Sequence, residues 1–284
     1  MNRPNFTLNP TNCSEFHVLA RIGGGGTDPF SSADDTFADR SARFQAASCG
    51  ALGFRPKLAL RLKGGAHRGA HPALRAVVTP RPGDANFQRA VVTLPRSAFL
   101  DQAHIRTICT RVQFAAGPGN GALCPKGAIY GKARAWSPLL DAPAEGPVYL
   151  RSSDNNLPDL VVALKGPASA PIDVELSARI DSRKGGIRSI FTGIPDVPVS
   201  RFILDMQGGK KGLIVNSRNL CFKPNRNRAR SNLIGQNGRR QTTKPRLVST
   251  KCAKRRKAKR KRNKAKRARS SHRVAHASGS NRRR

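Results

Sequence analysis

The chain has 284 residues, enough for two small domains and a tail, and no stretch approaches the roughly 18–20 consecutive apolar residues of a membrane span. Its formal charge of +37 is unevenly placed, because residues 206–284 hold 28 Lys and Arg and no acidic residue. The other residues hold 25 basic and 16 acidic side chains. The body of the protein is therefore mildly basic, and the extreme charge belongs to its C-terminal part.

Residues 1–50 predict a small disulfide-closed β segment, in which Gly23–Gly26 read as a turn because no Lys-Ser/Thr follows them as in a phosphate-binding loop. The opening, Met1 to Asn5, lacks the apolar region of a secretory signal. We expect the chain to be an N-terminally truncated piece of a protein that is extracellular or on the cell surface.

The first β-domain is predicted at 51–137, where Leu58, Leu60 and Leu62 lie on one face of a half-buried strand and the intervening positions include Lys57, Arg61 and Lys63. The range 138–147, rich in Pro and Ala, reads as a linker, and a second β-domain is predicted at 148–221. The clearest alternation places Ile172, Val174, Leu176, Ala178 and Ile180 inward. Further strands are expected at 74–79, 87–94, 128–136, 148–151, 160–164, 187–191, 202–206 and 213–215.

Many short strands bounded by Gly, Pro, Asn and Asp predict an all-β fold of two small Ig-like antiparallel β-sandwich domains. The similarity of 56–64 to 158–166 suggests that the two arose by duplication. One stretch departs from the period of two: within 99–112 the apolar residues Ile105, Ile108, Cys109 and Val112 recur at three and four, which predicts a short amphipathic helix. A strand ending in Cys109 is the alternative.

Residues 222–252 predict a disulfide-closed β-hairpin, because Gln236-Asn237-Gly238 contains a strong turn signal. The tail, 253–284, is basic and is expected to be disordered. Its charges must attract polyanions, and without interleaved aromatic residues any binding of nucleic acid would be unspecific. The residues expected to bind polyanions are Lys254, Arg255, Arg256, Lys257, Lys259, Arg260, Lys261, Arg262, Lys264, Lys266, Arg267 and Arg269.

The cysteines are even in number and include no CxxC pair, which favours a disulfide framework over zinc or redox chemistry. Each consecutive pair encloses a segment with turn signals, so sequential pairing is favoured. Scattered reduced thiols in a cytosolic protein are the alternative. The six residues are Cys13, Cys49, Cys109, Cys124, Cys221 and Cys252.

No catalytic, cofactor-binding or metal-binding site is predicted. His67 and His71 have a spacing that could bind zinc on a helix, but the surrounding glycines and Pro72 favour a loop. His104 lies near Asp101 and could be a general base, although a structural role is the simpler interpretation. The acidic and amide residues at 154–156 and 159 match no EF-hand loop and are explained by turn chemistry.

Distinctive phrases lie at 60–65, 71–74, 92–95, 109–114, 146–153, 157–160, 195–200 and 208–213. They resemble a group of uncharacterised, often repetitive exported proteins of actinobacteria. The resemblance spans nearly the whole chain and implies surface exposure and a missing N-terminal region, but it supplies no catalytic residues.

The sequence therefore predicts a non-enzymatic structural or adhesive module, secreted or on the cell surface, whose tail contacts anionic envelope polymers or polysaccharide. An unspecific nucleic-acid-binding protein acting through the tail is the alternative. A hydrolase on a β-sandwich is a third hypothesis, which would need a cleft with converging His and carboxylate side chains.

Overall fold

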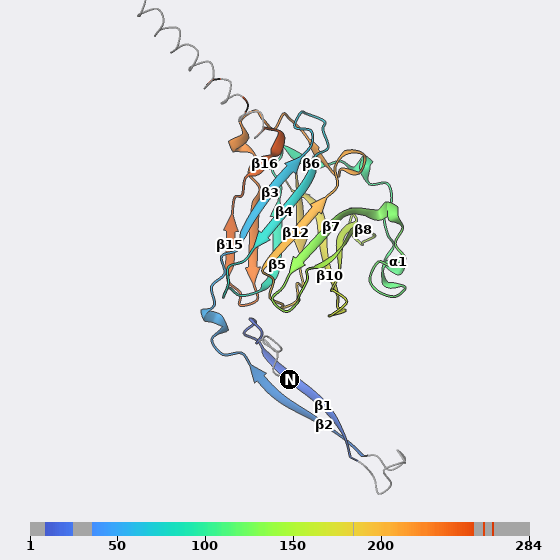
Figure 1. Ribbon diagram of the computed structural model, residues 1–284, viewed down its shortest axis with the longest axis vertical. Coiled ribbons are helices and arrows are strands. Elements are labelled where there is room, and N and C mark those ends of the chain that lie inside the picture. The colour runs from blue at the N-terminus through green and yellow to red at the C-terminus, as the bar shows by residue number, and fades with distance from the viewer. Residues whose placement is uncertain (1–8, 25–35, 184, 253–257, 259–262, 264–284) are drawn as a thin grey trace, which may run out of the picture.

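The computed structural model describes residues 9–24, 36–183, 185–252, 258 and 263 (Figure 1). Within them the chain forms sixteen strands, one short α-helix and five 3₁₀ turns. The twelve tail lysines and arginines expected to bind polyanions lie outside the described residues, as do Gly25 and Gly26. None of the helices in the described part of the chain is long and apolar enough to cross a membrane.

Twelve strands form one mixed sheet in the order β15-β14-β5-β11-β10-β9-β8-β7-β12-β4-β3-β16, and only β16 and β3 pair in parallel. Most of the expected strands and the hairpin at Asn237-Gly238 are confirmed. The strands of this sheet are β3 Lys57–Lys63, β4 Ala73–Thr79, β5 Phe87–Thr93, β7 Ile129–Trp136, β8 Ala144–Arg151, β9 Asp159–Lys165, β10 Asp173–Arg183, β11 Gly186–Phe191, β12 Arg201–Met206, β14 Arg230–Gly235, β15 Arg240–Thr243 and β16 Leu247–Ser249.

The mostly β character is confirmed, whereas two Ig-like sandwiches are not. Strands expected in different domains are neighbours in one sheet, since β5 pairs with β11 and β12 lies between β7 and β4. Part of the expected linker, 138–147, belongs to β8, which begins at Ala144. Alternation along a strand shows that one face is apolar, but it does not specify which strand pairs beside it or which face packs opposite.

The sheet curls until its two ends meet. Its first and last strands, β15 and β16, are consecutive in the sequence and separated only by residues 244–246. The backbone N–H of Ala229 donates to the carbonyl of Pro245 at 2.9 Å, and that of Leu247 donates to Asn227 at 2.8 Å. The link between the end strands is therefore bonded to the segment that leads into β14.

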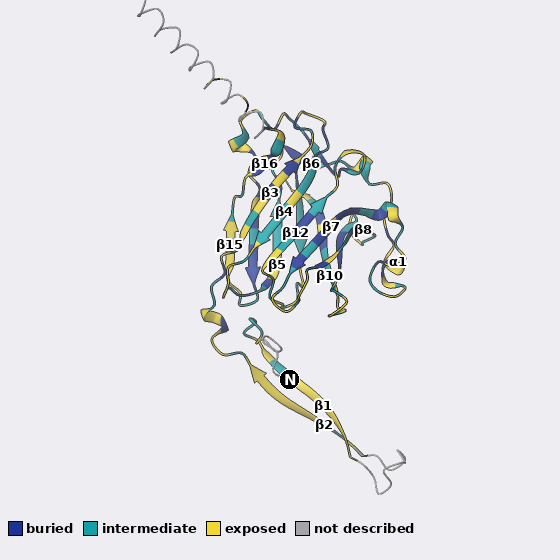
Figure 2. Ribbon diagram, viewed as in Figure 1, coloured by how far each residue is buried: buried dark blue, intermediate teal, exposed yellow. Residues whose placement is uncertain are grey.

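The inner face of the curled sheet carries the core. Leu60 and Leu62 of β3 are buried, and Lys57, Arg61 and Lys63 are exposed, as the alternation predicts. On β10, Ala178 and Ile180 are buried, whereas Ile172 precedes the strand and is 45% exposed. Figure 2 shows this alternation of burial along the strands.

Gly146 lets two central strands approach closely. A Cβ atom at this position of β8 would lie 1.6 Å from the carbonyl oxygen of Ala163 in β9. Only glycine fits there, because any other residue would force the two backbones apart.

The helix predicted within 99–112 is wrong. The strand β6, Ala98–Leu100, pairs with β13, Ile214–Asn216, in a separate two-stranded sheet. A 3₁₀ turn follows at Gln102–His104, where Asp101 accepts a hydrogen bond from the backbone of Ala103. The helix α1 begins later, at Arg111–Ala115, where Thr110 and Gln113 form a capping box. Asp101 and Thr110 each begin a separate short helical segment, so the stretch is not the single helix that the apolar spacing predicts.

The alternative to the helix, a strand that ends in Cys109, is not found either. Cys109 makes an isolated bridge to Arg151 and lies outside any named strand.

The structure contains three disulfide bonds with the sequential pairing that the cysteine order favours: Cys13–Cys49, Cys109–Cys124 and Cys221–Cys252. Such bonds are typical of proteins that fold in an oxidising compartment.

The N-terminal β segment is a long hairpin that projects from the body (Figure 1). Its strands β1, Glu15–Gly24, and β2, Thr36–Gln45, pair only with each other. Almost every described side chain on it is exposed, including the apolar Leu19 at 78% (Figure 2). The body must therefore hold this hairpin at its base.

Candidate functional site

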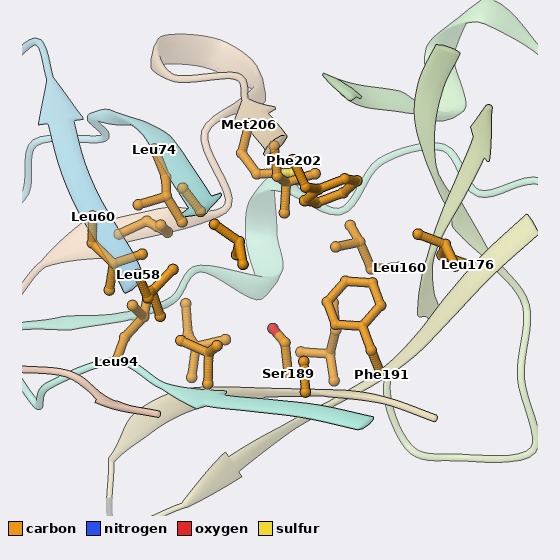
Figure 3. Close-up of a pocket in the computed structure, with 18 of the residues that line it drawn as sticks. Leu58, Leu60, Leu74, Leu94, Leu160, Leu176, Ser189, Phe191, Phe202 and Met206 are labelled. Atoms are coloured by element: carbon orange, nitrogen blue, oxygen red, sulfur yellow. The ribbon is translucent and has the colours of Figure 1, made fainter. Parts of the chain in front are cut away.

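The curled sheet encloses an apolar cavity, which we call the chamber, of about 180 Å³. One wall comes from β3, β4 and β12, and the other from β5, β10 and β11. Figure 3 shows their side chains projecting into the shared space. Those that mark the two walls most clearly are Leu58, Leu74, Phe202 and Met206 on the first and Leu176 and Phe191 on the second.

The number of strands explains why this space stays open. A closed sheet of about eight strands leaves an interior that side chains just fill, and more strands enclose more room. Here twelve strands curl until their ends meet. Leu58, Leu74, Val92 and Phe191 point inward yet are only half-buried, because nothing opposite covers them fully.

Polar groups are scarce in the chamber. Among the described residues that line it, Ser189 and Gln207 carry the only polar side chains and none is charged. The Ser189 hydroxyl faces the space (Figure 3). Burying an unpaired charge there would be very costly, so the chamber suits an uncharged, mainly apolar molecule.

A cluster of two histidines and a carboxylate lies beside one end of the chamber. Nε2 of His71 donates to Oδ2 of Asp101 at 2.7 Å, and Nε2 of His104 lies 3.9 Å from the same oxygen. The two imidazole rings are stacked with centroids 4.1 Å apart. Leu100 and Leu213, which line the chamber, directly adjoin Asp101 and Gly212, the latter a hydrogen-bond partner of His104.

Three separate segments position this cluster. His71 lies in the loop between β3 and β4, where its carbonyl accepts a hydrogen bond from the backbone of Gly209 at 2.9 Å. Asp101 follows β6, and its backbone N–H donates to Leu213 at 2.9 Å. His104 belongs to the 3₁₀ turn that Asp101 caps. The hydrogen bond from His71 lowers the pKa of Asp101, against the opposing effect of burial, so this carboxylate is ionised at neutral pH.

The sequence does not show that these three residues meet. The spacing of His71 from His67 suggested that these two act together, but Nδ1 of His67 bonds the carbonyl of Arg68. His104 is close to Asp101 in the sequence, but nothing there links it to His71. The pairing of β6 with β13 joins the two segments, because Asn216 of β13 is bonded through its backbone to Gly69 and Ala70 beside His71.

The acidic and amide side chains at 154–156 and 159, which the sequence explains by turn chemistry, make contacts within the turn and to α1. The carboxylate of Asp154 binds Nη2 of Arg111 at 2.7 Å, and Asn155 donates to Asp159 at 3.3 Å. Both contacts are exposed at the surface. This group is a turn tied to α1 by an ion pair.

A basic region covers the C-terminal part of the described body. Residues 206–252 contain no acidic side chain, and none of their lysines and arginines forms an ion pair with another described residue. Arg230, Arg240 and Lys244 are exposed on and beside β14 and β15, at one end of the sheet. We call residues 223–251 the basic edge.

Comparison of the whole chain with protein-family models, with curated proteins and with solved structures gives no match, so the candidate sites stand on their geometry alone.

Proposed function

We propose that this protein is a non-enzymatic binding protein that holds a small apolar molecule inside its curled sheet. The observation that carries the proposal is the chamber of about 180 Å³ with its uncharged, mainly aliphatic lining. An engineered apolar cavity of about 150 Å³ in another protein is dry and binds benzene or xenon.

A pair of variants on one strand tests this proposal. Ala76 lines the chamber from β4, whereas the next residue, Val77, is not among the lining residues because successive side chains point to opposite faces. Ala76→Phe should fill part of the chamber and lower the affinity for an uncharged apolar dye, N-phenyl-1-naphthylamine, at least tenfold. Val77→Phe should leave dye binding unchanged. Fluorescence titration of the two folded variants measures both.

Either of two results would overturn the proposal: no dye bound by the wild-type protein, or equal loss of binding in both variants. Thermal unfolding of each variant, followed by circular dichroism, shows that the comparison is made between folded proteins.

We place the protein outside the cytoplasm, secreted or on the cell surface, and the three disulfide bonds support this location. The resemblance to exported actinobacterial proteins agrees with it. Recovery of the protein from the source cell with its six cysteines reduced would contradict it.

A second candidate function is attachment to an anionic polymer, and the basic edge favours it. Its exposed cations precede the tail directly in the sequence and share its sign, so both would neutralise the same polymer. This is the adhesive role expected from the sequence, now extended to residues on the folded body. The alternative partner, nucleic acid, rests on the same charge.

Matched triple variants separate the basic edge from general charge. Replacing Arg230, Arg240 and Lys244 by Gln should weaken binding of a sulfated polysaccharide severalfold. For duplex DNA it should lower the slope of log affinity against log salt by about 2 to 3. The control replaces Lys57, Arg61 and Lys63, which are exposed on β3, and should change neither value. Equal effects of the two triples would contradict the proposal, and a preference for DNA at physiological salt would favour the nucleic-acid alternative.

A further inference from the structure

We propose that His71, Asp101 and His104 form a binding site for a divalent transition-metal ion of the zinc class. This inference goes beyond apolar binding, because none of the three residues lines the chamber. Each offers one donor atom, and the three donor atoms lie within 4.8 Å of one another.

The choice of donors favours zinc over calcium or magnesium. Imidazole nitrogens suit zinc, nickel and copper, whereas calcium and magnesium prefer sites made wholly of oxygen. Two neutral histidines and one ionised carboxylate carry a net charge of −1, which a dication offsets. Three protein ligands leave a fourth tetrahedral position open, and the side chains of the cluster are 20–25% exposed, so water can reach it.

Hydrogen bonds already prepare two of the donors. Nδ1 of His104 lies 2.9 Å from the carbonyl oxygen of Gly212. A carbonyl can only accept, so Nδ1 carries the hydrogen and the lone pair of His104 is on Nε2, beside Asp101. Histidines that bind metals usually donate their other N–H in this way. Asp101 accepts from the backbone of Ala103 with Oδ1, which leaves Oδ2 between the two histidines.

Metal binding requires a small rearrangement. Zinc bonds of about 2.0 to 2.2 Å bring donor atoms to about 3.3 Å from one another, closer than the widest spacing here. The stacked rings must turn so that their nitrogens converge, and the hydrogen that His71 shares with Asp101 must leave Nε2. In a neutral imidazole this hydrogen moves to Nδ1, so the lone pair on Nε2 becomes free for the metal without the net loss of a proton.

Cobalt titration of the full-length chain, after removal of metal with a chelator, tests this site. Tetrahedral Co²⁺ absorbs visible light strongly when bound to the protein, and zinc should displace it. We expect one site per chain. His71→Ala and His104→Ala should each weaken binding at least tenfold, whereas Asp101→Asn, which keeps the size of the side chain and loses its charge, should weaken it severalfold.

His67→Ala is the matched control, because His67 lies on the same loop as His71 but bonds the carbonyl of Arg68. It should bind cobalt as the wild type does. His104→Gln adds a variant that can still donate to Gly212, so that loss of metal is separated from loss of the turn. The proposal is overturned if the wild-type protein binds no cobalt, or if His67→Ala weakens binding as much as His104→Ala does.

The chamber variant Ala76→Phe distinguishes failure of this site from failure of the proposed function. It should bind cobalt normally while losing the apolar dye, because the two sites use different residues. Loss of cobalt binding in folded Ala76→Phe would contradict a separate metal site.

Discussion

Asp181 and Arg188 face each other across β10 and β11, on the outer surface of the curled sheet. Their neighbours Ile180 and Ser189 line the chamber, so these two side chains point away from it. Nε of Arg188 donates to Oδ1 of Asp181 at 2.7 Å, and a second bond joins Nη2 to Oδ2. The hydrogen bonding from Arg188 lowers the pKa of Asp181, against the opposing effect of burial.

This pair gives the stability of the protein a predictable dependence on pH. A carboxylate whose pKa is lowered by folding stabilises the fold fully above the pKa of the unfolded chain, about 3.9. That contribution is lost as the pH falls through the lower pKa of the folded state. Asp181→Asn should therefore be less stable than wild type at pH 7, by about 1 to 2 kcal/mol, because bonds between charged groups are replaced by weaker ones. Urea unfolding at a series of pH values measures the difference.

The difference between wild type and Asp181→Asn should shrink as the pH falls below about 4. Asp173→Asn, at the exposed start of the same strand, is the control. A gap between wild type and Asp181→Asn that stays constant down to pH 2 would show that the ion pair is not its cause.

At the scale of elements, the carboxylate of Asp196 binds the base of the hairpin β1–β2 to the body. Asp196 accepts hydrogen bonds from the backbone of Thr11 at 2.7 Å and of Asn12 at 2.8 Å. It also accepts from the hydroxyl of Thr11 and the side chain of Asn86, both at 2.7 Å. An isolated two-stranded hairpin is marginally stable, so these contacts and the Cys13–Cys49 bond fix its position.

Asp196→Ala should free the base of the hairpin without melting its strands. A hydrogen bond to a charged group contributes about 1.5 to 3 kcal/mol, so hydrogen exchange at the amides of Thr11 and Asn12 should become at least about tenfold faster. Amides paired between β1 and β2 should change little. Asp39→Ala removes an exposed carboxylate from β2 and serves as the control. Unchanged exchange at Thr11 and Asn12 in Asp196→Ala would show that other contacts hold the hairpin.

At the scale of the whole molecule, the sequence predicts the strands well because their signals are local. Alternation in 57–63 and the Asn237-Gly238 turn each act within a few residues, and both appear as expected. The order of strands could not be predicted, because β5 pairs with β11 and β14, far along the chain. The chamber could not be predicted either, because its walls come from strands that are far apart in the sequence. An apolar face is visible in the sequence, but the distance to the opposite wall is set by how far the sheet curls.

The metal cluster shows the same limit at the level of a site. Asp101 and His104 are close in the sequence, whereas His71 is thirty residues before Asp101 and reaches it only through the folded loops. The predicted helix over 99–112 failed because apolar spacing was counted without the two capping residues, Asp101 and Thr110, that divide the stretch. The cluster was missed because it joins segments that are distant in the sequence, and the helix was wrong because polar caps override a pattern of apolar residues.

The junction of β15 and β16 has a mechanical consequence. Because the two end strands of the sheet are consecutive in the sequence, residues 244–246 form a short covalent link between them. Backbone hydrogen bonds join residues 227 and 229 to residues 247 and 245 at this link. The sheet cannot separate along this seam without breaking those hydrogen bonds and stretching the link. A molecule that binds in the chamber, as proposed above, would therefore have to pass the ends of the strands and not this seam.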